Sequence, residues 1–355
     1  MAKLETRIGD LCLKNPVIAA PGEHLIDIEG VRAAIEAGAG AVVGKSINES
    51  QAARHQLQQA EYTLLDRDWN KVDWSEDAPR GLTVFTRSGL PSLTFDAWLL
   101  QAVNMDRLAG QHDCLFVPSL VLAQPAAALD MARAIQAAGL KLLELNIGTP
   151  YASQAARCAV STELVPERVA KLTGMMVEAL DIPVWIKISG QSERVGDLAE
   201  AAFSAGAQSV VMAGRSLGLV PDLETQKPVL DTSCGIGGYW NLPITCHWLA
   251  TSRRRLGLGC PLIGTNGATN GRDVARMMLA GSSAVGLSSE VMLRGWRVIT
   301  DAVDELEAYC DKMGMSAADL IGRAADARRT YTELPTVGDH WRNFIPSTAD
   351  AAPEG

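Results

Sequence analysis

The stretch "AIQAAGLKLLEL" at residues 134–145 decides the fold. Its alanine-rich first half has helical spacing, Gly139 ends that helix, and the leucine-rich second half has the character of a strand. The same order of helix, Ala-Gly stop and strand recurs in "AIEAGAGAVV", "AAFSAGAQSVVM" and "MMLAGSSAVGL". Glycine at a helix end just before a strand is typical of the loops that join helices to parallel strands. The sequence therefore predicts a chain of alternating strands and helices.

Eight apolar runs have the length of strands and lack strict alternation, as expected of parallel strands buried on both faces. These runs span residues 16–20, 41–45, 115–121, 142–147, 184–189, 209–213, 261–265 and 284–288. The helical patterns between them span residues 28–37, 94–109, 125–137, 165–180, 195–205, 242–255, 271–279 and 291–313. Eight such units predict an α/β fold of the (β/α)8 TIM-barrel class. A doubly wound sheet is the alternative, which the lack of G-x-G-x-x-G after the first strand disfavours.

We expect one domain over residues 1–345 and a disordered tail at 346–355. Two long segments, 47–91 and 215–241, follow the second and sixth strands. Because insertions at the carboxyl ends of barrel strands normally build the active site, we expect both to do so here. Residues 53–70 within the first segment have the spacing of an amphipathic helix that covers the barrel mouth or contacts a partner.

Composition narrows the class of protein. No apolar run has the length of a membrane span, and the polar N-terminus lacks the centre of a signal peptide, so a cytoplasmic protein is expected. A net charge of −9 without a basic stripe weighs against nucleic-acid binding. The seven cysteines form no C-x-x-C pair and the histidines show no metal spacing, so no metal site is predicted.

The ends of the predicted strands indicate a ligand. Lys45 and Lys187 end apolar strands, where a buried ammonium needs an anion or an acceptor. Asn146 ends another of these strands, and in a barrel its side chain should lie near the two lysines. The last two strands end in the small turns Asn266-Gly267 and Ser288-Ser289, whose backbone N–H groups suit a phosphate. Flavin mononucleotide (FMN) fits both features, with a lysine beside the reduced ring.

Several motifs resemble one known family. They are "LKNPVIAAPG" at 13–22, "GAGAVVGKSI" at 38–47, "RSGLPSLTFDAWL" at 87–99, "LELNIGTPY" at 143–151, "VWIKIS" at 184–189 and "PLIGTNGATNGRDVARMMLAGSSAVGLSS" at 261–289. In this order they resemble the dihydroorotate dehydrogenases and the FMN domain of dihydropyrimidine dehydrogenases. The resemblance implies a homodimeric flavoprotein, an oxidoreductase of the EC 1.3 type that exchanges hydride between a substrate CH–CH bond and flavin N5, in either direction.

The resemblance also implies roles for individual residues. The expected FMN contacts are Ala20, Gly22, Lys45, Ser46, Asn146, Lys187, Gly238, Asn266, Gly267, Ser288 and Ser289. The expected substrate contacts are Thr86, Arg87, Ser88, Ser92, Tyr151 and Arg215. Several of these replace the asparagines that hold a pyrimidine in the family, so we expect a substrate other than dihydroorotate. Arg87 and Arg215 could instead hold a carboxylate.

The proton carrier is expected at one of two residues. Thr149 occupies the family's position before proline, and Cys158 lies in the following loop. We favour Cys158, because a thiol with a pKa of about 8.5 exchanges protons near neutrality. Two alternatives to a self-contained flavoenzyme remain. One is a flavin-free, phosphate-binding lyase or isomerase with Lys187 as the Schiff base. The other is a flavoprotein subunit that passes electrons to a partner protein. It remains an alternative because the sequence does not identify the electron acceptor.

Overall fold

The computed structural model describes residues 3–149, 163–212 and 214–346. Its main sheet is parallel, in the order β8 (Leu115–Val117), β4 (Ala41–Val43), β3 (Val17–Ala19), β16 (Ser282–Leu287), β15 (Leu262–Thr265), β12 (Ser209–Met212), β11 (Val184–Lys187), β10 (Leu143–Asn146) and β9 (Ser119–Val121). β8 and β9 are consecutive pieces of one strand, separated by Pro118, which has no N–H to donate. Ile47, just after β4, pairs with Leu120 of β9. The sheet therefore closes on itself, and the predicted TIM barrel is confirmed.

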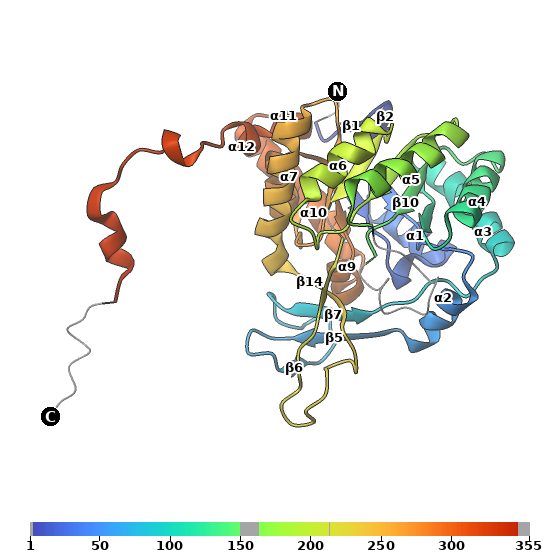
Figure 1. Cartoon of the computed structure of the whole chain (residues 1–355), viewed down its shortest axis with the longest axis horizontal. Coiled ribbons are helices and arrows are strands. Elements are labelled where there is room, and N and C mark those ends of the chain that lie inside the picture. The colour runs from blue at the N-terminus through green and yellow to red at the C-terminus, as the bar shows by residue number, and fades with distance from the viewer. Residues whose placement is uncertain (1–2, 150–162, 213, 347–355) are drawn as a thin grey trace.

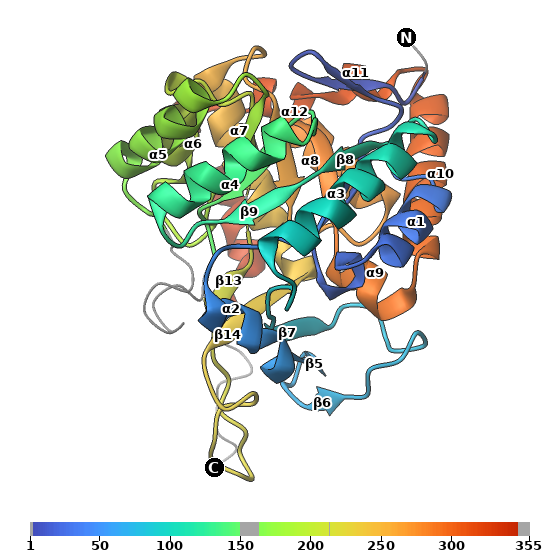
Figure 2. The ribbon, with the colours of Figure 1, turned by 90° about the vertical axis from the view of Figure 1, so that its right-hand side faces the viewer.

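The helices form a ring around this barrel (Figures 1 and 2). They are α1 (Ile28–Glu36), α3 (Phe95–Gly110), α4 (Pro125–Ala137), α5 (Pro166–Ala179), α6 (Val195–Ser204), α7 (Leu242–Leu256), α8 (Gly271–Ala280) and α10 (Arg297–Met313). The predicted glycine stops have positive φ at Gly38, Gly139, Gly206 and Gly281. The helix predicted over 291–313 is wrong as one element. It is α9 (Ser289–Arg294) followed by α10, because the chain leaves helical geometry at Gly295, whose φ is +80°.

The amino ends of the barrel strands are closed by a hairpin. Its strands β1 (Thr6–Ile8) and β2 (Leu11–Leu13) contribute Ile8 and Leu13 to the cluster of buried side chains that fills the barrel, together with Trp185 and Ile263. A second and larger cluster lies between the barrel and its helices. Access to the barrel interior is therefore from the carboxyl ends of the strands.

A second sheet, which we call the cap sheet, lies across those carboxyl ends (Figure 1). It is antiparallel and has the order β13 (Ser216–Gly218), β14 (Cys234–Gly238), β7 (Thr83–Arg87), β5 (Glu61–Leu65) and β6 (Lys71–Val72). Both predicted insertions contribute to it. The helix expected over residues 53–70 is wrong: only α2 (Gln51–His55) and the 3-10 turn η2 (Gln56–Gln59) are helical. β5 pairs with β7 along its whole length, and this non-local pairing overrides the local helical spacing.

The buried body of the chain ends with the short helices α11 (Ala317–Leu320) and α12 (Arg323–Asp326). Every residue from 326 to 346 is exposed, and the chain runs away from the body after Arg328, which still bonds to α7 (Figure 1). It contains the 3-10 turns η4 (Tyr331–Glu333) and η5 (Gly338–Phe344). The tail predicted at 346–355 lies, after residue 346, outside the described residues. No helix in the described part of the chain is both long and apolar enough to cross a membrane.

Candidate active site

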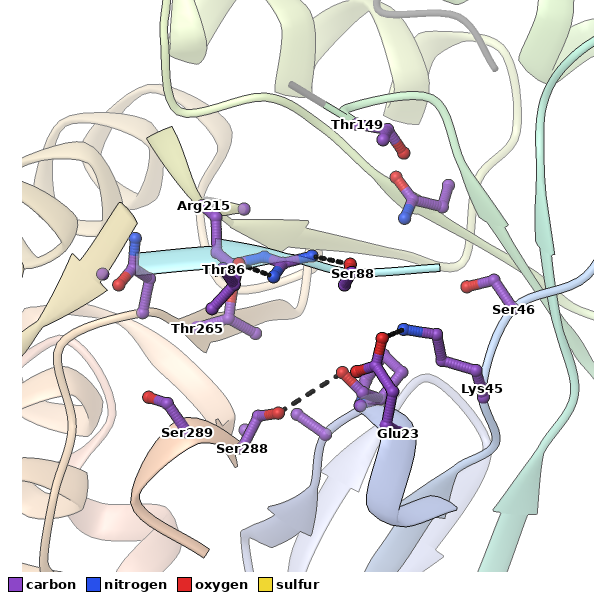
Figure 3. Close-up of a pocket in the computed structure, with 18 of the residues that line it drawn as sticks. Glu23, Lys45, Ser46, Thr86, Ser88, Thr149, Arg215, Thr265, Ser288 and Ser289 are labelled. Carbon is purple, nitrogen blue, oxygen red and sulfur yellow. Dashed lines mark hydrogen bonds and ion pairs between the residues drawn. The ribbon is translucent and has the colours of Figure 1, made fainter. Parts of the chain in front are cut away.

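One pocket opens between the carboxyl ends of the barrel strands and the cap sheet (Figure 3). Its lining includes Ala20, Gly22, Lys45, Ser46, Asn146, Lys187, Asn266, Gly267, Ser288 and Ser289, all of them predicted FMN contacts. The remaining predicted contact, Gly238, is not part of the lining, whereas its neighbour Gly237 is. Both lie on β14, where successive residues face opposite sides. Gly237 therefore replaces Gly238 as the candidate contact.

The predicted substrate residues divide in the same way. Thr86, Ser88 and Arg215 line the pocket. Arg87 does not, because it follows Thr86 on β7 and faces the other side of the cap sheet. There it donates to the carbonyl oxygens of Gln59 and Leu230, each at 2.8 Å, and to the Glu61 carboxylate at 2.6 Å. Because Arg87 is held on that side and does not line the pocket, the prediction that it contacts the substrate is wrong.

The other predicted residues have three different outcomes. Ser92 is exposed and does not line the pocket, so its prediction as a substrate contact is also wrong; it lies beyond the end of β7, on the way to α3. Thr149 lines the pocket. Tyr151 and Cys158 lie outside the described residues.

Two lysines, the buried Lys45 and the half-buried Lys187, give the pocket a positive character. The pairing of β10 with β11 sets Asn146 opposite Lys187 at the pocket floor. Burial lowers the pKa of Lys187; Glu144 opposes that shift and Arg215 adds to it. Among the described residues, no carboxylate forms an ion pair with Lys187. Lys45, in contrast, lies 3.1 Å from a carboxylate oxygen of Glu23. A pocket with this charge suits an anionic or electron-rich ligand.

Arg215 joins the barrel to the cap sheet. It follows β12 in the chain, and its guanidinium donates hydrogen bonds to the hydroxyl of Thr86 and, at 3.0 Å, to that of Ser88 (Figure 3). These bonds involve the two terminal nitrogens, Nη1 and Nη2.

The turns after β15 and β16 have the donors and the space that a phosphate needs. Gly267 has a φ of +115°, and a Cβ there would lie 2.4 Å from the backbone nitrogen of Leu242. The side-chain nitrogen of Asn266 is buried without a partner among the described residues. Ser288 and Ser289 line the same part of the pocket. The unpartnered amide of Asn266 here, together with two lysines further along the pocket, fits the phosphate and the ring of FMN.

Sequence reasoning missed several lining residues, of which Glu23 and Tyr62 matter most. Glu23 immediately follows the predicted contact Gly22 in the loop after the first strand, and that position was the available signal. Tyr62 had none, because it lies in the segment predicted to be helical. The hydroxyl of Tyr62 donates to the carboxylate of Glu23, so the two residues act together.

Comparisons with known proteins bear on this pocket. A family model described as "Dihydroorotate dehydrogenase" matches residues 77–310. The chain is 26% identical over 313 residues to "Dihydroorotate dehydrogenase B (NAD(+)), catalytic subunit" of Methanosarcina acetivorans, which covers 87% of this chain and 92% of that protein. It is also 26% identical over 331 residues to the protein of the same name from Thermococcus kodakarensis, covering 92% and 99%.

Two further similarities widen the comparison. The chain is 29% identical over 198 residues to "Dihydroorotate dehydrogenase A (fumarate)" of Lactobacillus helveticus, covering 55% of this chain and 62% of that one. A crystal structure of a DHODH from Eimeria tenella in complex with ferulenol superposes with a TM-score of 0.70 at 14% identity, covering 93% of this chain and 90% of the other. At that identity the structural likeness supports the fold alone.

Proposed function

The chain belongs to the dihydroorotate dehydrogenase family, and from this premise we propose that it takes hydride from a CH–CH bond of a small substrate that carries a carboxylate. The observation that carries the substrate part is Arg215, held at the pocket by Thr86 and Ser88. A guanidinium that lines the pocket has the charge and the planar shape that carboxylate recognition uses. FMN, when bound, would supply flavin N5 as the hydride acceptor.

Membership of the family confirms the predicted resemblance, the enzyme class and FMN as the cofactor. The flavin-free lyase or isomerase is therefore set aside. We assign the phosphate of FMN to the turns at Asn266-Gly267 and Ser288-Ser289. Lys187 and Asn146 would hold the flavin ring: the ammonium would stabilise its electron-rich edge, and the amide would help to orient it.

Dihydroorotate is the first substrate to test. The relatives from Methanosarcina acetivorans and Thermococcus kodakarensis are named for it and match this chain over most of their length. Dihydroorotate also has a carboxylate beside its reacting CH–CH bond. The second candidate is a carboxylate without a pyrimidine ring. It is favoured by Thr86 and Arg215, which stand at the pocket where the family resemblance led us to expect amides.

The experiment is anaerobic reduction of the flavin by candidate substrates. Bound FMN absorbs near about 370 and 450 nm, and hydride transfer bleaches the longer-wavelength band. We expect bleaching by dihydroorotate, none by dihydrouracil, which lacks the carboxylate, and a comparison with acyclic carboxylates such as succinate to decide between the two candidates. Bleaching by dihydrouracil at the same rate as by dihydroorotate would contradict the carboxylate proposal. A purified protein that does not take up FMN would overturn the function itself.

The proton that accompanies the hydride also needs a carrier. We propose Cys158, with Thr149 as the alternative at the pocket wall. Cys158→Ala is expected to retain FMN while losing substrate-dependent bleaching, whereas Thr149→Val is expected to retain both. Full bleaching in Cys158→Ala with loss in Thr149→Val would reverse the assignment.

The electron acceptor and the assembly complete the proposal. Relatives are named for NAD(+) as a catalytic subunit and for fumarate, so reoxidation of the reduced flavin is measured with each acceptor. We propose that the electron acceptor is a partner protein. We also propose that this chain forms a homodimer in the cytoplasm. Rapid reoxidation by fumarate alone argues against the partner. Light scattering of the purified chain tests the dimer.

A further inference from the structure

We propose that Glu23 is a positioning residue whose carboxylate both fixes Lys45 in the pocket and anchors the cap sheet to the barrel. Glu23 begins the 3-10 turn η1 (Glu23–Leu25), directly after the first barrel strand. None of its contacts was expected from the sequence. The anchoring of the cap does not depend on the proposed function. The effect on the flavin does rest on the proposed function.

Three groups from separate parts of the chain meet at this one carboxylate. Oε1 accepts a hydrogen bond from the backbone N–H of Gly89 at 3.0 Å and lies 3.1 Å from Nζ of Lys45. Oε2 accepts the hydroxyl of Tyr62. Lys45 follows β4 of the barrel, Tyr62 lies on β5 of the cap sheet, and Gly89 follows β7 (Figure 3 shows the Glu23–Lys45 pair). The carboxylate therefore links the barrel to two segments of the cap.

Burial makes these contacts matter. The side chain of Lys45 is 8% exposed and that of Glu23 is 17% exposed. Burial alone would raise the pKa of Glu23, but Lys45, Tyr62, Arg215 and the Gly89 N–H together hold it below its ordinary value. Glu23 is therefore a carboxylate at neutral pH. Removal of one partner of a buried ion pair leaves the other charge uncompensated, which destabilises strongly.

The close approach at Gly89 shows how tightly the cap is held here. A Cβ on Gly89 would lie 2.3 Å from the backbone nitrogen of Leu57. The N–H of Gly89 reaches Glu23 because the chain carries no side chain at that point. Elsewhere the cap is held by Arg215 and by Arg294 of α9, which donates to the carbonyl oxygens of Glu76 and Pro79. Glu23 is the acidic anchor of the cap at the pocket.

The pair also sets the charge beside the proposed flavin. With Glu23 ionised, the charge of Lys45 is balanced by the carboxylate 3.1 Å away. A neutral residue at position 23 adds one net positive charge. Positive charge near the ring favours the reduced, electron-rich flavin, so the midpoint potential rises.

The first test uses the apoprotein and does not depend on FMN. Backbone hydrogen exchange is compared among the native chain, Glu23→Gln, Glu23→Ala and the control Glu61→Gln. Glu61 is the neighbour of Tyr62 on β5 and pairs with Arg87 on the outer side of the cap sheet, so Glu61→Gln changes the same charge away from the pocket. We expect Glu23→Ala to accelerate exchange in residues 61–65 and 88–90 by about tenfold or more, and Glu23→Gln by less, because its amide oxygen still accepts from Gly89.

Exchange in helix α8 serves as the internal reference for the fold. Unchanged exchange at 61–65 and 88–90 in both Glu23 variants overturns the anchoring role. If Glu23→Ala does not fold, Glu23→Gln and Tyr62→Phe carry the test, the latter with faster exchange confined to β5.

The second test uses the FMN-loaded protein at pH 6.5. We expect a more positive midpoint potential in Glu23→Gln and an unchanged one in Glu61→Gln. An unchanged potential in Glu23→Gln overturns the role at Lys45. A protein that binds no FMN overturns the proposed function and leaves the exchange result standing, so the two failures are distinguishable.

Discussion

Arg215 is the residue with which the pocket can select its substrate. Its guanidinium is oriented by the hydroxyls of Thr86 and Ser88 in the free protein. Binding of a carboxylate therefore costs little further side-chain entropy. Lysine has the same charge but a single nitrogen, so it lacks the planar fork with which a guanidinium binds both oxygens of a carboxylate.

We therefore expect Arg215→Lys to raise the KM for the carboxylate substrate by about 10-fold to 100-fold, and Arg215→Gln by more, with FMN retained. The measurement is steady-state kinetics of flavin-dependent turnover. Arg87→Lys is the control, because Arg87 faces the other side of β7. If Arg87→Lys raised KM as much as Arg215→Lys, the pocket assignment would be wrong.

His24 makes stability depend on pH. Burial, and then the charge of Lys45, lower its pKa to about 4 from the ordinary 6.5, and Glu23 opposes this shift. Its ring packs against Trp296 with centroids 5.3 Å apart. Between pH 4 and 6.5 the unfolded chain binds a proton here that the folded chain does not. This residue therefore contributes a loss of stability as the pH falls through that window, up to about 3 kcal/mol.

We predict that His24→Phe removes this part of the pH dependence. Both ring nitrogens are buried without partners among the described residues, so phenylalanine leaves no hydrogen bond broken. Urea denaturation of both proteins from pH 4 to 8 provides the free energies of unfolding. Parallel curves for the two proteins across the whole range would refute the assignment.

Single residues also show where prediction from sequence ended. Lys45, Lys187 and Asn146 could be placed at the pocket because each ends a buried strand, and strand ends meet at one edge of a barrel. Arg87 and Gly238 could not, because their facing depends on which side of the cap sheet turns toward the barrel. Glu23 could not either, because its partners are distant in the sequence.

At the level of the elements, the barrel strands were predictable and the cap strands were not. A buried parallel strand has a continuous apolar run, as in β10 and β12. β14 has the sequence "CGIGG", which has little intrinsic strand preference, and it is a strand because it pairs with β7 and β13. The strand predicted over residues 115–121 is divided at Pro118 into β8 and β9. The proline itself indicated this break, since proline rarely sits inside a strand.

The turn after β15 is expected to be intolerant of a side chain. We predict that Gly267→Ala lowers the free energy of unfolding by about 2 kcal/mol or more and weakens FMN binding, because its φ is +115° and a Cβ would collide with the backbone of Leu242. Thermal unfolding and FMN titration measure the two effects. Gly110→Ala at the end of α3 is the control, because a Cβ there meets no atom within 4 Å. Equal stability of both variants would contradict the prediction.

At the scale of the whole molecule, the alternation of strands and helices was enough to predict the barrel, because the eight units share one local pattern. The extent of the body was less predictable: residues 326–346 are exposed throughout, although the sequence placed the domain end at 345. This segment contains large apolar side chains such as Tyr331 and Phe344, as a packed region does, but these side chains are exposed.

We predict that deletion of residues 330–355 leaves the body intact. Arg328 is kept, because it donates a hydrogen bond to Thr251 of α7. The expected change in melting temperature is within about 2 °C, since residues 330–346 are all exposed, and FMN content should equal that of the full chain. A fall of more than about 5 °C would show that the segment stabilises the fold.

The origin of the cap sheet in two separate insertions has a consequence for folding kinetics. Thr86 of β7 donates to the carbonyl of Gly235 of β14, which lies 149 residues further along the chain. Closure of so long a loop is entropically costly until the barrel units between the two strands have formed. During synthesis β5, β6 and β7 therefore lack a partner at the β7 edge until β14 has been made. The pocket is consequently the last part of the molecule to be completed.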